Sequence, residues 1–124
     1  MNRGWGVTAA AFGAAAVALG AFGAHALRGH LDESALAIWH TAVEYQFWHA
    51  LALLAIAGSA KSPLRAWRYS GVSFATGIVL FSGSLYALAL GAPRGIGLVT
   101  PLGGAALIIG WIFLGVACCA ATKE

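Results

Sequence analysis

The sequence predicts an all-α membrane protein, a four-transmembrane-helix bundle with short loops in which residues 1–124 form a single transmembrane domain. Three observations support this prediction: few charges, many apolar residues, and four apolar stretches. Of the 124 residues, 60% are hydrophobic and only 9% are charged, whereas about a quarter of an average soluble domain is charged. Seven basic and four acidic residues cannot coat a soluble globule, and disordered chains are poor in apolar residues. We therefore expect the lipid bilayer to surround the chain.

Four stretches have the length of a membrane span, for which a helix needs about 20 mostly apolar residues. Three of them contain no Asp, Glu, Lys or Arg, and the second contains only Glu44. The predicted spans cover about residues 4–26, 35–59, 69–90 and 98–121. Together with their connections they use nearly the whole chain, which leaves no room for a soluble domain.

The first span consists mainly of Ala and Gly. Small residues that recur four apart let helix backbones approach closely in lipid. The predicted helix-packing positions are Gly13, Ala16, Gly20 and Ala24, with Gly103 and Gly104 in the last span. Packing within the bundle is the simpler interpretation, and a homo-oligomer formed through this face is the alternative. The apolar run is longer than the core of a signal peptide, which has about 7–15 residues, so we expect this helix to be retained.

The connections contain signals for helix ends and turns. Asp32 or Ser34 is placed to cap the second helix, and Pro101 lies in the first turn of the fourth, where a missing N–H is harmless. Residues 91–95 have the composition of a turn. Four tryptophans, mostly near predicted interfaces, are interpreted as aromatic-belt anchors: Trp5, Trp39, Trp67 and Trp111.

The basic residues predict the orientation of the chain in the membrane. With four spans, both termini and the connection at 60–68 share one side of the bilayer. That side carries Arg3, Lys61, Arg65, Arg68 and Lys123, and the other carries Arg28 and Arg94. Because cytoplasmic loops are enriched in Lys and Arg, both termini are predicted to be cytoplasmic. No basic run with interleaved aromatic residues is present, so nucleic acid is not an expected partner.

The second span carries polar side chains on two faces. His40 lies at its predicted outer boundary, Glu44 about 6 Å deeper at 1.5 Å per residue, and His49 near the midplane. At about 100° per residue, His40 and Glu44 share one face, and Tyr45 and His49 share another about 140° away. Lipid cannot satisfy both faces. We therefore expect this helix to be the most enclosed of the four, or one face to meet another subunit.

Polar residues of all four spans gather in the predicted outer half of the bundle. The candidates for a ligand or proton pocket are His25, His40, Glu44, Tyr45, Gln46, His49, Ser82, Ser84, Tyr86 and Thr100. This clustering favours a protein that binds or passes a small solute, a proton or a lipid headgroup. Because an unpaired carboxylate in lipid is costly, Glu44 is expected to be protonated, paired with His25 or His40, or reached by water. The alternative is a structural or accessory protein whose polar groups lock the helices and whose small-residue faces dock to another membrane protein.

Catalytic and metal chemistry find less support. Ser82 or Ser84 with His49 is a conceivable nucleophile and base, but no nucleophile elbow or carboxylate pair accompanies them. No two histidines have a ligand spacing on one helix, so we predict neither a metal site nor a cofactor.

Four motifs follow one another along the predicted spans. They are GAFGAH at 20–25, EYQ at 44–46 followed by His49, LFSGSLY at 80–86, and TPLGG at 100–104. Together they resemble the YgdD-like family of small inner-membrane proteins, the family of domain of unknown function 423. The resemblance covers essentially the whole chain and implies a multi-pass protein of the bacterial inner (plasma) membrane without a settled activity. It places the motifs on the polar cluster, except for His40, and it supplies no reaction.

Overall fold

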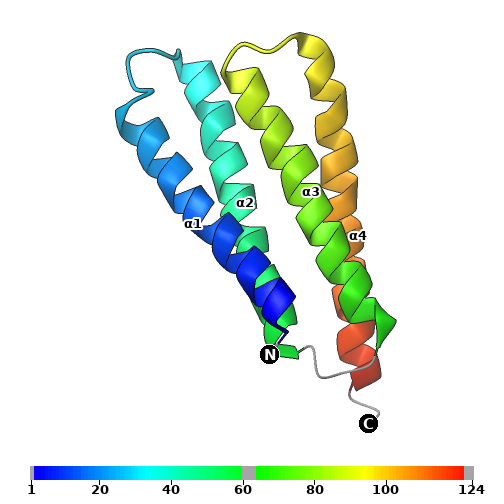
Figure 1. Ribbon diagram of the computed structural model, residues 1–124. Coiled ribbons are helices and arrows are strands. Elements are labelled where there is room, and N and C mark those ends of the chain that lie inside the picture. Colours follow the sequence, from blue (N-terminus) through cyan, green and yellow to red (C-terminus); the bar gives the residue numbers. More distant parts are fainter. Residues whose placement is uncertain (1, 60–63, 122–124) are drawn as a thin grey trace.

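In the computed structural model, residues 2–59 and 64–121 are described, and they form long α-helices joined by short loops (Figure 1). The helices are α1 (Arg3–His25), α2 (Glu33–Ser59), α3 (Arg65–Ala89) and α4 (Val99–Ala121), with a short 3₁₀ helix, η1 (Arg94–Leu98), before α4. The described ranges contain no β-strand. The predicted α-helical class is therefore confirmed.

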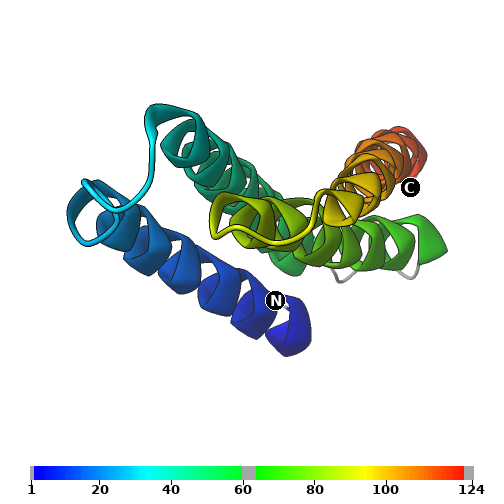
Figure 2. The same cartoon turned by 90° about the horizontal axis from the view of Figure 1, so that it is seen from above.

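Each helix packs mainly against its neighbours in the sequence. α2 lies between α1 and α3, and α4 packs on α3 (Figure 1). Seen from above, α1 and α4 lie on opposite sides of the molecule (Figure 2). Within the two described ranges these outer helices share no extensive contact. The helices form an open series rather than a closed ring of four, so each keeps an uncovered face.

Three segments are long and apolar enough to cross a bilayer: α1, α3, and Arg94–Ala121, which combines η1 and α4. α2 is longer than α1, with 27 residues, and at 1.5 Å per residue it extends about 40 Å. Polar residues interrupt its apolar sequence, and it is not one of these three segments. Length and packing therefore make α2 similar to its neighbours, while composition sets it apart.

The buried apolar side chains form two clusters. The larger cluster lies mainly where α2, α3 and α4 meet, and its largest fully buried members are Phe74, Leu53 and Ile56. The smaller one lies near the α1–α2 loop and contains Leu27, Trp39 and Ala89. Both clusters contain residues of α2 and α3, which are the two central helices of the series.

Side-chain and glycine caps define the helix ends. The Oδ1 atom of Asp32 accepts a hydrogen bond from the N–H of Ala35 at 2.7 Å, so Asp32 is the cap of α2. After α3, Gly91 has a φ of 97°, and the N–H of Ala92 donates to the carbonyl oxygen of Ala87 at 2.9 Å. This is a Schellman motif, in which glycine takes a left-handed conformation that side chains disfavour. It ends α3 and starts the turn predicted at 91–95.

Two expectations from the sequence differ from the structure. α3 begins at Arg65 rather than near Tyr69, so part of the predicted 60–68 connection is helical. The interpretation of the tryptophans as belt anchors is wrong for Trp39 and Trp67, which are only 3% and 8% exposed. These indoles fill space between helices, where large flat side chains bury much apolar area. Lys61 and Lys123, on which the predicted orientation partly rests, lie outside the described residues.

Candidate functional site

Gln46 connects three helices. It lies on the inward face of α2 with 4% of its surface exposed. Its Nε2 atom donates to the carbonyl oxygen of Phe12 in α1 at 2.9 Å, and its Oε1 atom accepts a hydrogen bond from the hydroxyl of Tyr86 in α3 at 2.8 Å. Both ends of the amide are therefore used in contacts between helices.

His49 lies one turn further along α2 and is bonded at both ring nitrogens. Nε2 accepts a hydrogen bond from the indole N–H of Trp111 in α4 at 3.0 Å. Because an indole only donates, this nitrogen carries no proton. Nδ1 lies 2.6 Å from the carbonyl oxygen of Tyr45, which accepts but cannot donate. The contacts thus assign a neutral imidazole with its proton on Nδ1.

The predicted serines also bond across helices. The hydroxyl of Ser82 in α3 donates to the carbonyl oxygen of Ala42 in α2 at 2.7 Å. The hydroxyls of Ser84 and Thr100 lie 2.6 Å apart and connect α3 with α4. Neither serine is paired with His49, whose ring nitrogens have other partners. The nucleophile and base considered from the sequence are not assembled.

Other contacts of the same kind were not anticipated from the sequence. The indole N–H of Trp39 in α2 donates to the carbonyl oxygen of Leu19 in α1 at 2.8 Å. The hydroxyl of Ser70 in α3 donates to the carbonyl oxygen of Gly110 in α4 at 2.8 Å. The sequence feature that could have indicated the buried position of Trp39 is Gly23 in α1. An added Cβ at Gly23 would lie 2.5 Å from the indole of Trp39, so only glycine leaves room for it.

The predicted helix-packing positions fall into two groups. Gly103 lies against backbone, since an added Cβ would meet the backbone nitrogen of Phe81. At Gly20 such an atom would lie 3.3 Å from Val43, and Ala16 is only 1% exposed. By contrast, Gly104 has looser contacts, Gly13 has open space, and Ala24 is exposed. Spacing alone does not distinguish a buried face from an uncovered one.

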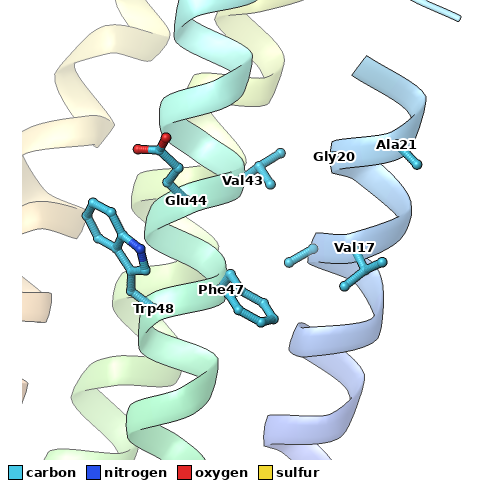
Figure 3. A pocket seen from close by; sticks show the side chains of 8 residues that line it. Val17, Gly20, Ala21, Val43, Glu44, Phe47 and Trp48 are labelled. Carbon is cyan, nitrogen blue, oxygen red and sulfur yellow. The ribbon is translucent and has the colours of Figure 1, made fainter. Parts of the chain in front are cut away.

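Glu44 and His40 lie on the opposite face of α2 and are exposed. Neither side chain has a hydrogen bond or ion pair to any residue that the structure describes. Figure 3 shows Val43 and Phe47 directed toward α1, whereas Glu44 and Trp48 lie on the far side of α2. His25 is exposed at the end of α1. The structure therefore brings neither His25 nor Glu44 into the polar network formed by Gln46, His49 and the serines.

Two grooves flank this face of α2. The first, of about 300 Å³, lies between α1 and α2 and is lined by Ala16, Val17, Gly20, Ala21, Val43, Glu44, Phe47 and Trp48 (Figure 3). The second, of about 580 Å³, lies between α2 and α4 and is lined by Tyr45, Trp48, His49, Phe81, Gly104, Leu107, Ile108 and Trp111. Both linings are largely apolar, and Trp48 belongs to both. Among the residues that the structure describes, no three His, Cys, Asp or Glu side chains gather as metal ligands would.

Comparison with known proteins identifies the family. The family described as "Protein of unknown function (DUF423)" matches residues 19–104. The chain belongs to this family. The match begins in the second half of α1 and ends at the start of α4, so it includes Gln46, His49, Ser82, Ser84, Tyr86 and Thr100.

Curated relatives support the same assignment. The UPF0382 membrane protein YwdK of Bacillus subtilis is 47% identical over 104 residues, which are 82% of this chain and 85% of the relative. A UPF0382 membrane protein of Haemophilus influenzae is 50% identical over 98 residues, 79% of each chain. The UPF0382 inner membrane protein YgdD of Escherichia coli is 44% identical over 99 residues, 79% of this chain and 76% of the relative. No solved structure matches the chain.

Proposed function

We propose that the protein is a non-catalytic structural or accessory protein of the bacterial inner membrane. In this proposal it crosses the bilayer four times with both termini in the cytoplasm. Its inner polar residues lock the helices together. The observation that carries the proposal is that Gln46, His49, Ser82, Ser84, Tyr86 and Thr100 are each hydrogen-bonded to a residue of another helix.

The argument for four spans rests on packing. α1, α3 and Arg94–Ala121 are apolar enough to cross a bilayer, and α2 packs extensively against both α1 and α3. A helix packed between two spanning helices shares their depth, and its inward polar groups then face protein rather than lipid. Polar residues within membrane helices usually face the bundle interior in this way.

The buried polar side chains already have hydrogen-bond partners within the protein, which disfavours an internal ligand site. A binding pocket presents polar groups that lack a partner within the protein and converge on a ligand. Here both polar atoms of the Gln46 amide, Nε2 and Oε1, are hydrogen-bonded, and so are both ring nitrogens of His49. These contacts leave the interior little unused capacity to bind a ligand, and they support helix locking instead.

Two measurements test the proposal together. The variants Gln46→Leu, His49→Leu and Ser82→Ala should each lower the midpoint of thermal unfolding in detergent, because each removes at least one hydrogen bond between helices. Vesicles with the wild-type protein should show the proton and K⁺ leak of protein-free vesicles. Unchanged unfolding midpoints in all three variants would contradict the locking role, and a leak that the wild-type protein raises would contradict the accessory role.

A second candidate function, binding or passage of a small solute, a proton or a lipid headgroup, is favoured by one observation. The carboxylate of Glu44 borders a groove of about 300 Å³ and has no bonded partner among the described residues. This function predicts a flux that the Glu44→Gln variant abolishes while its unfolding midpoint stays unchanged. Equal flux in wild type and variant would remove it.

A further inference from the structure

The outward face of α2 has the pattern of a helix–helix contact surface, although no described residue covers it. Its exposed residues are Ala37, His40, Glu44, Trp48 and Leu51. Their spacing of three and four residues is that of a seam between packed helices. The indole of Trp48 and the side chain of Leu51 are each 51% exposed. Large apolar groups and two ionisable groups thus share one stripe.

Lipid suits this stripe poorly. Glu44 lies eleven positions from the start of α2 at Glu33 and fifteen from its end at Ser59, so it is well inside the helix. A carboxylate in a membrane-spanning segment needs a hydrogen-bonding or cationic partner, because hydrocarbon offers none. Within its own chain Glu44 has none among the described residues. A partner from outside the described part of the chain is therefore needed.

We infer that a second copy of the chain covers this stripe, so that α2 packs against α2 and His40 of each copy bonds Glu44 of the other. The inference rests on the proposed function in that α2 spans the membrane. The charge pattern selects a second copy as the occupant. The stripe contains one acid and one base, so it is complementary to itself, as a two-fold interface requires.

The membrane restricts the geometry of this pair. Copies that insert with the same orientation are related by an axis along the membrane normal, which places identical residues at equal depth. His40 of one copy then lies about 6 Å along the helix from the level of Glu44 of the other, a rise of four residues. An imidazole and a carboxylate on flexible stems span such a diagonal. The two carboxylates repel each other at one level, and each imidazole N–H offsets this by donating to one of them.

The groove between α1 and α2 supplies the apolar part of the interface. On its α1 side the exposed lining residues are Val17 and Ala21, while Ala16 is buried and Gly20 packs against Val43 of the same chain. The groove adjoins Glu44 and Trp48 (Figure 3). The half-exposed indole of Trp48 in each copy fits the groove of the other. Small residues facing a large one allow the close approach by which helices associate in lipid.

An exchange of the two ionisable residues tests the inference. Copies with donor and acceptor fluorescent tags are reconstituted at a series of protein-to-lipid ratios, and energy transfer reports association. His40→Leu and Glu44→Leu should each raise the ratio needed for half-association by about tenfold or more, because leucine neither donates nor accepts a hydrogen bond and each change therefore removes both symmetry-related bonds. The double variant H40E/E44H keeps one acid and one base, and should return to within about threefold of the wild-type ratio.

The matched control is His25→Leu, which removes an exposed imidazole that lies off the stripe and should leave association unchanged. Three results would overturn the inference: a wild-type protein that stays monomeric at every ratio, a Glu44→Leu variant that associates like wild type, or an H40E/E44H variant no better than the single variants. Association that requires a different protein would also overturn it.

Cysteine accessibility separates this inference from the proposed function. With Cys118 and Cys119 replaced by Ser, Leu54→Cys places a single thiol on an exposed position of α2. Labelling by a membrane-impermeant maleimide would show that α2 lies outside the bilayer, and the proposed function would fail. A protected thiol together with absent energy transfer would overturn the dimer alone.

Discussion

The two polar faces of α2 differ in every contact that they make. On the inward face, the Gln46 amide and the His49 imidazole bond to α1, α3 and α4. On the outward face, His40 and Glu44 are exposed and bond to no described residue. Residues of similar polarity on one helix thus have different physical consequences. The inward ones are part of the fold, whereas the outward ones are available to whatever lies beside the protein.

The strongest test of this difference exchanges a long polar side chain for leucine on each face. Gln46→Leu should lower the free energy of unfolding by about 2–4 kcal/mol, because it removes two hydrogen bonds between helices and leaves the Tyr86 hydroxyl without its acceptor. Glu44→Leu, two positions away, should change it by no more than about 0.5 kcal/mol. Denaturant titration of the monomer in detergent measures both values. Similar losses in the two variants would show that the faces do not differ.

A smaller loss is expected where the interior excludes any side chain. Gly103→Ala should lower the free energy of unfolding by about 1–3 kcal/mol, because its Cβ would overlap the backbone of Phe81 in α3 and overpacking forces the helices apart. Its neighbour provides the control. A Cβ at Gly104 would lie 3.7 Å from the ring of Phe81, an ordinary contact, so Gly104→Ala should leave stability nearly unchanged. Equal sensitivity at both positions would contradict the close approach of α4 to α3.

A double-mutant cycle sharpens the description of the inward face. His49→Leu and Trp111→Phe each remove one partner of the bond between α2 and α4, so their combined effect should fall short of the sum by about 0.6–1.7 kcal/mol, the range of interhelical hydrogen bonds in membranes. The pair His40→Leu and Trp111→Phe has no such bond and should be additive. Additivity in both cycles would mean that the His49–Trp111 contact contributes nothing.

The smallest change in the free energy of unfolding is expected when the Glu44 carboxylate is neutralised. Glu44→Gln keeps the shape of the side chain and removes its charge. Since the carboxylate has no partner among the described residues, the monomer's free energy of unfolding should change by less than about 0.5 kcal/mol. Thermal unfolding in dilute detergent, where chains are separate, provides the measurement. A large loss would place Glu44 in the internal network after all.

Much of the fold was predictable because lipid imposes simple rules. Apolar stretches of about 20 residues predicted the helices, and the observed bounds differ from the predicted ones by at most four residues. The cap at Asp32 and the turn after α3 followed from local chemistry. The site was predictable only in part. The polar positions were identified from the sequence. Helical periodicity of about 100° per residue, however, shows only which residues share a face, and not which face another helix covers.

The sequence by itself determined the α-helical class, the approximate helix bounds and the presence of two polar faces on α2. These depend on local hydropathy and on helical periodicity, which each segment carries alone. Only the tertiary structure decided that Gln46 and His49 face inward, that Trp39 and Ser70 bond across helices, and that Glu44 lies uncovered. The reason is physical: whether a polar group is satisfied depends on the carbonyls and rings that neighbouring helices place within about 3 Å of it. Those neighbours are distant in sequence, so no local pattern specifies them.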